Sequence, residues 1–377
     1  MKIKTITCHH VYNYGASLQA YALQHYLESL GHEVEIIDFN PWFHCDRYNP
    51  FWYPKNGKYA PIFKVLPFLR VLVMPFKAFV NGMFVTWGRK SAFDSFEKKH
   101  YHLSRRKYQN SEELKKYAPS ADIYIAGSDQ IWNTYSENGK EPAYYLGFGS
   151  KSVKRISYAA SLATNSIMEG YEDFVKRNLL NFNAISVREN TGKNILSQLC
   201  ITDVEVVLDP VFLLEKEQWD ILAQQGKMYG LKEKSYVLVY DFLGNDMKMV
   251  NFIKQYSVKH SLQVVSINDF NTRSYADLNI NNAGPLEFLA LIKNAACVVA
   301  SSFHATAFSV IFEKEFYTFN LQGFNNSSRM KDLLLSLNIV DRLNPNTESM
   351  ILDYFKISNI LDNLVCNSKM FIKNNIK

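Results

Sequence analysis

The chain has 377 residues, of which 47% are hydrophobic and 21% charged, and its formal net charge is +6. A chain of this length is too long for a single small hydrophobic core, so it predicts two domains. Its composition is that of an ordinary globular protein. Five widely spaced cysteines form no CxxC pair, which argues against a disulfide framework or a structural zinc site and suits a reducing cytoplasm. No unbroken apolar run follows the first lysines, so no signal peptide is expected.

The first half of the chain alternates between strand-like and helix-like segments. An opening βαβ unit consists of a β-rich run, an amphipathic helix ended by Gly31, and an alternating second strand. The expected strand segments, some running into loops, are 2–8, 32–40, 121–129, 154–161, 183–190 and 204–214. The expected helices are 18–31, 111–120, a segment ending near Phe182, and 191–199.

Positive charge gathers in residues 41–95, an insertion in this first half. Between Asp46 and Asp94 there is no acidic residue, whereas eight Lys or Arg residues and twelve aromatic residues occur there. Such a mixture suits an anionic membrane surface or a phosphate-bearing partner. No nucleic-acid-binding motif accompanies it, so no nucleic-acid partner is expected. The alternative interpretation is an irregular insertion that covers the domain's own core.

The second half repeats the alternation from residue 235 onward. Residues 294–312 carry no formal charge and approach the length of a membrane span. Because this segment contains several polar residues, we interpret it as a buried strand followed by a helix. The expected strands are 235–244, 262–269 and 296–302, and the expected helices are 247–260, 285–295 and 304–314.

Strands that alternate with helices in both halves predict parallel sheets and an α/β fold. We expect two doubly wound, Rossmann-like domains, residues 1–204 and 205–377, which face each other across a cleft in a GT-B-like arrangement. Ligands of open α/β sheets bind outside the carboxyl ends of the strands, so functional residues are sought there.

The stretch NYGASLQAYAL, residues 13–23, places small residues at the turn between the first expected strand and the helix that follows it. Gly15 permits close approach of the backbone, and free amides at a helix start suit an anion or a sugar hydroxyl. A purely structural turn is the alternative. The preceding CHH looks metal-like, but neighbouring side chains of a strand face opposite sides, so His9 and His10 are not expected to share an ion. No metal site is predicted.

The loop AGSDQIWN, residues 126–133, follows a strand and carries Ser128, Asp129 and Asn133 at its carboxyl end. Asp129 is suited to accept a proton from a sugar hydroxyl, or to cap the next helix. Two further strand ends carry Arg188 in SVRE and Asp209 in LDPV. Arg188 either grips a carboxylate or phosphate with its planar fork or pairs with a neighbouring carboxylate. We interpret Asp209 as a turn or domain-junction residue rather than a catalyst.

His304 stands in SSFHAT, after a strand and at the start of a helix. A histidine there serves as a buried spacer, a metal ligand or a proton carrier. This position predicts that it lies at the cleft between the domains, where the helix N-terminus disfavours the imidazolium form.

In this order, NYGASLQAYAL, GSDQIWN, SVRE, LDPV and SSFHATAFS resemble the polysaccharide pyruvyl transferase family over roughly residues 5–340. The resemblance implies a GT-B-like enzyme that transfers pyruvate from phosphoenolpyruvate onto a sugar, usually as a cyclic ketal, without an essential metal. It implies that His304 is the catalytic acid and Arg188 a phosphoenolpyruvate ligand. The N-terminal domain is then expected to bind the acceptor and the C-terminal domain the donor.

The chain departs from the family pattern at one position. Many members have a basic residue two positions before the histidine, where Ser302 stands here. This substitution removes one expected anion contact, and Arg329 or Lys193 are the candidates to replace it. The remaining candidates, for the acceptor or the cleft, are Asn13, Gly15, Ser128, Asp129 and Asn133.

The sequence therefore predicts a cytoplasmic enzyme with phosphoenolpyruvate as co-substrate and no cofactor. Its acceptor would be a sugar of a surface polysaccharide or of a lipid-linked precursor, with peripheral contact at the inner membrane face. The alternatives are a GT-B glycosyltransferase that uses a nucleotide sugar and a sugar-binding protein that has lost catalysis.

Overall fold

The computed structural model describes residues 1–44, 68, 73, 83–268, 271–321 and 328–377. Apart from Phe68 and Val73, residues 45–82 of the predicted insertion therefore lie outside the described residues. The end of the insertion forms part of helix α4 (Met83–His100), which the sequence did not predict.

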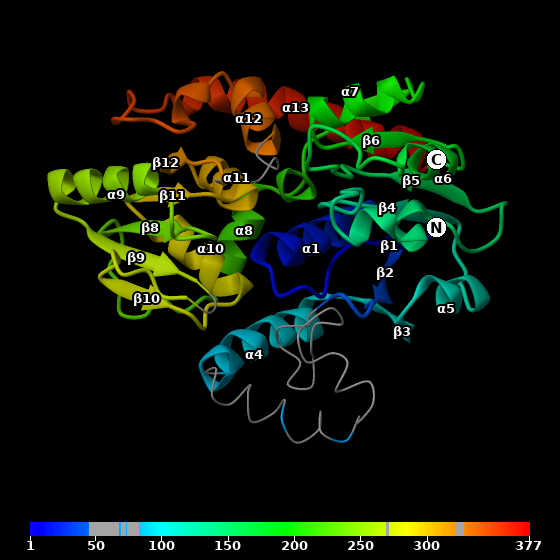
Figure 1. The fold of residues 1–377 in the computed structure, drawn as a ribbon, viewed down its shortest axis with the longest axis horizontal. Helices are drawn as coiled ribbons and strands as arrows, with labels where there is room; N and C mark the ends of the chain where they lie inside the picture. The colour runs from blue at the N-terminus through cyan, green and yellow to red at the C-terminus, as the bar shows by residue number, and fades with distance from the viewer. Residues whose placement is uncertain (45–67, 69–72, 74–82, 269–270, 322–327) are drawn as a thin grey trace.

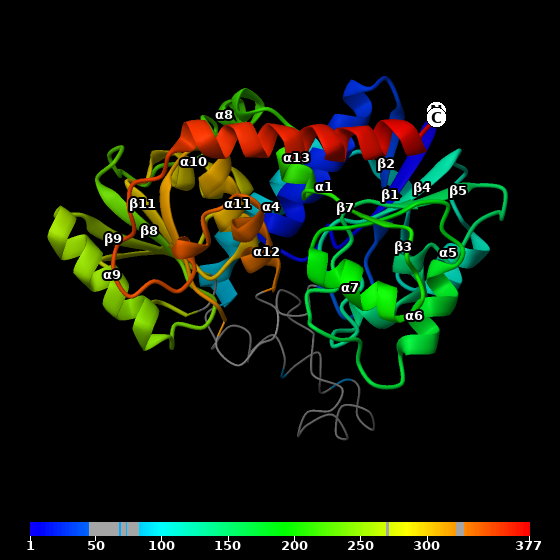
Figure 2. The ribbon, with the colours of Figure 1, turned by 90° about the horizontal axis from the view of Figure 1, so that it is seen from above.

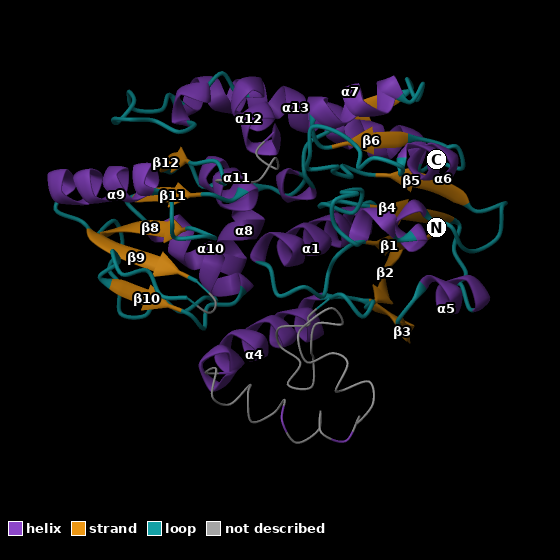
Figure 3. Ribbon diagram, in the orientation of Figure 1, coloured by secondary structure: helices purple, strands orange, loops and turns teal. Residues whose placement is uncertain are grey.

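The first half of the chain is built on a parallel sheet of five strands in the order β3-β2-β1-β4-β5 (Figures 1 and 3). Two shorter strands, β6 and β7, pair in parallel with each other, and bridges such as Ile156–Ala184 join them to the β5 side. The strands are β1 (Lys2–Ile6), β2 (Glu33–Phe39), β3 (Leu103–Tyr108), β4 (Ile123–Ala126), β5 (Lys154–Ser157), β6 (Ile185–Val187) and β7 (Val204–Val206).

The second half has a separate parallel sheet of five strands, in the order β10-β9-β8-β11-β12. Its central strand β8 is buried along its whole length, as expected for a parallel strand covered on both faces. The predicted α/β class with two parallel, doubly wound units in a GT-B-like arrangement is confirmed. The strands are β8 (Tyr236–Tyr240), β9 (Gln263–Ile267), β10 (Leu278–Ile280), β11 (Cys297–Ala300) and β12 (Glu315–Thr318).

The helices include several that the sequence pattern did not indicate, among them α8, α12 and α13. The first helix begins at Tyr14 rather than at residue 18, because the side chain of Asn13 accepts hydrogen bonds from the Gly15 and Ala16 amides. Besides α4, the helices are α1 (Tyr14–Ser29), α5 (Ser111–Lys116), α6 (Glu172–Leu179), α7 (Asn190–Gln198), α8 (Lys216–Ala223), α9 (Met247–His260), α10 (Pro285–Asn294), α11 (Phe303–Ile311), α12 (Ser328–Ser336) and α13 (Tyr354–Asn375).

The two halves are packed against each other along α1 and α13. Tyr14 of α1 is fully buried and stacks on Phe288 of α10 with a centroid distance of 4.6 Å. In Figure 2, α13 runs across both halves, and its C-terminal end lies beside the first sheet. There the Ser368 hydroxyl accepts a hydrogen bond from the Leu208 amide at 2.9 Å. The division into domains 1–204 and 205–377 stays a prediction, since β7 pairs with β6 and α13 returns to the first half.

None of the helices in the described part of the chain combines the length and the apolar character that a membrane span requires.

Candidate active site

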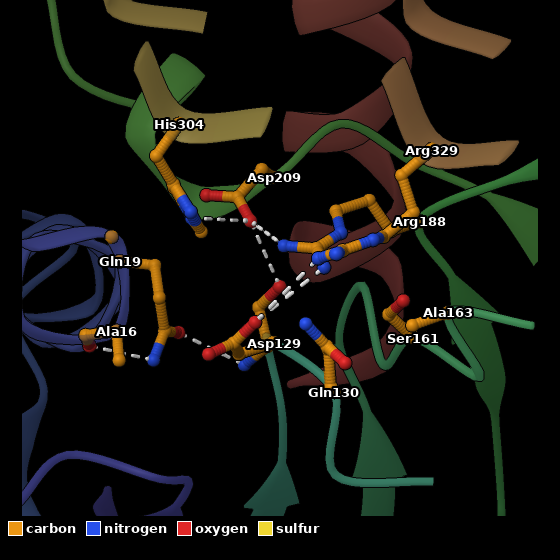
Figure 4. A network of polar contacts seen from close by, with 12 residues as sticks. Ala16, Gln19, Asp129, Gln130, Ser161, Ala163, Arg188, Asp209, His304 and Arg329 are labelled. Carbon is orange, nitrogen blue, oxygen red and sulfur yellow. Dashed lines mark hydrogen bonds and ion pairs between the residues drawn. The ribbon is translucent and has the colours of Figure 1, made fainter. Parts of the chain in front are cut away.

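His304 lies at the start of α11, one residue after the helix begins at Phe303, so the predicted strand–helix junction is confirmed. The helix starts there because Ser302 caps it: its hydroxyl accepts a hydrogen bond from the Ala305 amide at 3.4 Å. The side chain of His304 is only 7% exposed. It lies where the second sheet faces α1 of the first half (Figure 4).

Gly15 of α1 packs directly against the imidazole ring of His304. A Cβ atom at this position would lie 1.9 Å from Nδ1 and 2.2 Å from Cγ of His304, distances that no pair of unbonded atoms can adopt. The absence of a side chain at Gly15 is therefore what allows the two halves to meet at the histidine.

Asp209 lies at the centre of the polar network in Figure 4. Its carboxylate is fully buried, and Oδ2 accepts hydrogen bonds from Arg188 Nη1 at 2.6 Å and from the Ser128 hydroxyl at 3.1 Å. His304 Nε2 lies 3.4 Å from the same oxygen. Burial alone would raise the pKa of Asp209, but the charges of His304 and Arg188 outweigh it and hold that pKa well below its usual value.

Arg188 follows β6 and presents its guanidinium to three carboxylates, those of Asp209, Asp129 and Glu189. Burial would lower the pKa of this guanidinium, but the three carboxylates outweigh burial and raise it. The group stacks over Phe303 at 4.5 Å from the ring centroid. Its Nε and Nη2 atoms are buried and have no hydrogen-bond partner among the described residues. Nη2 lies 3.6 Å from Asp129 and Nε lies 3.9 Å from Glu189, so both donors face carboxylates at ion-pair distance without forming a hydrogen bond.

A second arginine comes from α12 of the other half. Arg329 is 9% exposed, its Nη1 lies 4.0 Å from Asp129 Oδ1, and its guanidinium is 6.0 Å from the centroid of the Phe303 ring. Burial, together with the positive charge of Arg188, lowers the pKa of Arg329 to about 10. Lys193, the other candidate replacement, is exposed on α7.

Asp129 is the most open carboxylate of the network, with a side chain that is 15% exposed. It has a φ of 66°, a left-handed conformation that Asp tolerates better than most residues. Gln19 of α1 supports this loop through hydrogen bonds. The Ser128 amide donates to Gln19 Oε1 at 3.1 Å, and Gln19 Nε2 donates to the Thr7 hydroxyl at 2.9 Å. This support fixes Asp129 at the carboxyl edge of the first sheet.

Comparison with known protein families identifies the family of the chain. The profile of the polysaccharide pyruvyl transferase family matches residues 13–323, which include every network residue above except Thr7 and Arg329. The chain belongs to the polysaccharide pyruvyl transferase family. Its family is one of enzymes, so the prediction of an enzyme is confirmed. None of the curated proteins compared with this chain matches it.

Solved structures resemble this chain only distantly. A UDP-GlcNAc 2-epimerase of Methanocaldococcus jannaschii is 12% identical with a TM-score of 0.49, and the match covers 97% of this chain and 93% of that one. A UDP-GlcNAc 2-epimerase of Neisseria meningitidis is 10% identical with a TM-score of 0.47, covering 99% and 93%. A glycosyltransferase of avilamycin A biosynthesis is 9% identical with a TM-score of 0.48, covering 100% and 97%.

The predicted site residues divide into two groups. Gly15, Ser128, Asp129, Arg188, Arg329 and His304 meet in one network. The others serve local structure: Asn13 and Ser302 cap α1 and α11, and the amide of Asn133 bonds within its own loop, to Gln130 and Tyr135.

Two further residues take part in the network, Asp209 and Glu189. From sequence we interpret Asp209 as a turn or domain-junction residue; its side chain does accept a hydrogen bond from the Val211 amide at the start of the turn Pro210–Phe212, and it also contacts Arg188 and His304. Glu189 accepts hydrogen bonds through Oε1 from Ser161 and from the Leu162 and Ala163 amides, and burial raises its pKa.

A cavity of about 210 Å³ adjoins the Arg188–Asp209 pair. Phe303, Asp332 and Ser368 contribute to its wall, and the described residues that line it do not include His304. Within the described ranges, no group of three or more His, Cys, Asp or Glu side chains is arranged to hold a metal ion.

Proposed function

We propose that this protein transfers pyruvate from phosphoenolpyruvate to a sugar of a surface polysaccharide or of its lipid-linked precursor, forming a cyclic ketal and releasing phosphate. One observation carries the proposal. A buried histidine from the second half lies 3.4 Å from Asp209, which also pairs with Arg188, and the guanidinium groups of Arg188 and Arg329 lie 4.5 Å and 6.0 Å from the centroid of the Phe303 ring. Ketal formation from this donor needs such a pairing of a proton donor with a cationic grip.

The two arginines are suited to the anionic groups of the donor. Phosphoenolpyruvate carries a carboxylate and a phosphate. In this proposal the donor competes with Asp129 and Glu189 for Nη2 and Nε of Arg188, which face these carboxylates without a hydrogen bond and have the forked geometry that such anions accept. Arg329 supplies the second cation, in place of the basic residue that many family members have at the position of Ser302. The Ser302 hydroxyl and the N-terminus of α11 add further donors.

His304 acts as the acid. It gives a proton to the methylene carbon of phosphoenolpyruvate, and C2 becomes an oxocarbenium-like electrophile that a sugar hydroxyl attacks. The C–O bond to phosphate then breaks, and a second hydroxyl closes the ring. Of the two hydroxyl protons, one restores His304 and the other leaves with phosphate, so the reaction balances without a cofactor. Histidine titrates near neutral pH, which suits it to this exchange.

The first half binds the acceptor in this proposal. Asp129 is the base for the sugar hydroxyls, since it is the most exposed carboxylate of the network and lies at the carboxyl edge of the first sheet. Asn13, Gly15, Ser128 and Asn133 stay the other candidates for the acceptor or the cleft in this proposal.

A cytoplasmic location with peripheral contact at the inner membrane face follows from a lipid-linked acceptor. The sequence of the 41–95 insertion, basic and aromatic, supports this contact. Flotation with anionic vesicles tests it: the full chain should float with the vesicles, and a variant without residues 45–82 should not. Failure of the full chain to float would refute the proposed contact with the membrane.

The function is tested by incubating the protein with phosphoenolpyruvate and candidate sugar acceptors. Acceptor-dependent release of phosphate, together with a ketal on the product, is the expected result. Release of a nucleoside diphosphate from a nucleotide sugar would instead identify a glycosyltransferase. Binding of the sugar without turnover of either donor would identify a protein that has lost catalysis.

A further inference from the structure

Asp209 joins the anion-binding part of the site to His304, yet it has no access to a substrate. Its side chain is completely buried. Oδ1 accepts a hydrogen bond from the Val211 amide at 3.1 Å, which fixes the carboxylate at the start of the short helix Pro210–Phe212. Oδ2 faces Arg188, Ser128 and His304 together. A group with this geometry acts through its neighbours rather than on the reacting atoms.

The two ring nitrogens of His304 have different surroundings. Nε2 is buried and lies 3.4 Å from Asp209 Oδ2, an ion-pair distance, and it forms no hydrogen bond among the described residues. A Cβ on Gly15 would lie 1.9 Å from Nδ1, 2.2 Å from Cγ and 2.5 Å from Cε1. A Cβ that lay in the plane of the ring, 1.9 Å from Nδ1, would be much farther from both Cγ and Cε1 than these distances. The Cβ position therefore lies above the ring, and Gly15 covers the face of the imidazole. The in-plane direction of Nδ1 is therefore not blocked by Gly15.

We propose that Asp209 is a positioning residue that holds the Nε2–H of His304, so that Nδ1 carries the proton given to the methylene carbon. This inference rests on the proposed pyruvyl transfer. In the step, the Nδ1–H bond breaks and a C–H bond forms with the electron pair of the enol double bond. The imidazolium becomes a neutral imidazole that keeps its proton on Nε2, toward Asp209. A proton from a sugar hydroxyl later returns to Nδ1.

The charges around His304 explain why a carboxylate is needed there. The N-terminus of α11 disfavours a positive charge on its own histidine. Arg188 and Arg329 add positive charge from the first half and from α12, and Asp129 and Glu189 compensate it on the far side of Arg188. The phenol of Tyr158 donates a hydrogen bond to the Leu208 carbonyl at 3.0 Å; burial, and then the charge of Asp209, raise its pKa far above the ordinary value, so it stays neutral. Asp209 is the carboxylate within 4 Å of the imidazole among the described residues.

Arg188 and His304 share one oxygen of Asp209, and this links anion binding to the proton donor. A substrate anion at Nε and Nη2 of Arg188, which form ion pairs but no hydrogen bond, takes over part of the charge compensation that Asp209 otherwise provides. Oδ2 is then freer to accept from His304. The donor substrate thereby strengthens the orientation of the acid that will protonate it.

The tautomer of His304 tests the inference without any turnover. The full chain is labelled with ¹⁵N-histidine, the His304 signals are assigned with His304→Gln, and both ring nitrogens are titrated. We expect the neutral ring to carry its proton on Nε2, and this preference to be lost in Asp209→Asn. Asp241→Asn is the matched control, because Asp241 is buried in the second half and hydrogen-bonded to Tyr275. A neutral His304 with its proton on Nδ1, or a preference unchanged in Asp209→Asn, would overturn the inference.

The pH dependence of turnover gives the second readout. In Asp209→Asn the imidazolium loses its neighbouring negative charge, so the alkaline limb of the pH–rate profile should move to lower pH, and kcat should fall on the order of 100-fold. Asp241→Asn should leave the limb in place. A limb that stays in place in Asp209→Asn would contradict the positioning role. If Asp209→Asn does not fold, the tautomer of the wild-type chain still decides. Absence of phosphate release by the wild type would refute the pyruvyl transfer alone.

Discussion

Replacement of Gly15 by alanine tests how closely the two halves meet at His304. The added Cβ would lie 1.9 Å from Nδ1 and 2.2 Å from Cγ of His304, so the histidine or helix α1 must shift. His304 cannot easily yield, because Asp209 lies on one side of its ring and α11 anchors its backbone. The substitution therefore displaces the proposed acid while it removes no polar group.

The size of the effect follows from packing. Forcing a methyl group into a close-packed site typically costs about 1–3 kcal/mol, which lowers the melting temperature by a few degrees in a protein of this size. Displacing a catalytic group by about 1 Å is associated with losses on the order of 100-fold in rate. We therefore expect Gly15→Ala to be folded, slightly less stable, and strongly impaired in kcat.

Thermal unfolding and acceptor-dependent phosphate release measure the two effects. Gly88→Ala in α4 is the matched control, because its new Cβ would meet Asn282 Cβ at 3.1 Å and requires only a small adjustment. In a His304→Ala background, Gly15→Ala should cost little stability, since the ring it strikes is gone. An equal loss of stability in both backgrounds would refute the reasoning, and so would full activity of Gly15→Ala.

Three further predictions concern charge and packing. Arg188→Lys and Arg329→Lys should each raise the KM for phosphoenolpyruvate at least 10-fold in steady-state kinetics, since lysine keeps the charge but loses the planar fork. Asp209→Asn should lower the free energy of unfolding by roughly 3–5 kcal/mol at neutral pH, because it leaves Arg188 undercompensated. Since the pKa of Asp209 is depressed in the folded protein, this stabilisation is present above the ordinary carboxyl pKa and is lost as pH falls through the depressed value, so denaturant curves of variant and wild type should converge in acid. Tyr14→Ala should lower the free energy of unfolding by about 3–5 kcal/mol, because it removes the ring that stacks on Phe288 and leaves a cavity between the halves.

Each of these predictions has an opposing result. An unchanged KM in both arginine variants would remove them from donor binding. A stability difference for Asp209→Asn that persists unchanged in acid would mean that its charge does not stabilise the fold. A loss below 1 kcal/mol for Tyr14→Ala would mean that the contact between the halves contributes little.

The fold was predictable from sequence where the hydrophobic pattern is strong. The segments that form β8 and β11, and the helices between them, have clear apolar patterns bounded by glycine or polar residues. Their type, strand or helix, therefore followed from the periodicity. The helix α13 was not predicted, since its apolar residues are divided between two halves that only the tertiary structure brings together. Helix α4 was missed because it begins inside a stretch whose composition suggested an irregular insertion.

The site was predictable as separate residues at strand ends, but not as a network. Position after a strand indicated His304, Arg188 and Asp129, because the carboxyl ends of parallel strands gather ligands. The place of Asp209 in the network was not predicted, because an aspartate before proline is typical of a turn. Its contacts come from three segments that are distant along the chain. The role of Gly15 depends on a ring nearly 290 positions away along the chain, and no local pattern encodes that contact.

Turnover in deuterated water tests the central claim most directly, because protonation of the methylene carbon is the step assigned to His304. The protein is incubated in D₂O with phosphoenolpyruvate and an accepted sugar, and the methyl group of the product is examined by NMR and mass spectrometry. The account predicts a pyruvate ketal whose methyl group carries a single solvent deuterium, and no product from His304→Ala. A ketal without deuterium, or an equal rate of formation by His304→Ala, would contradict it.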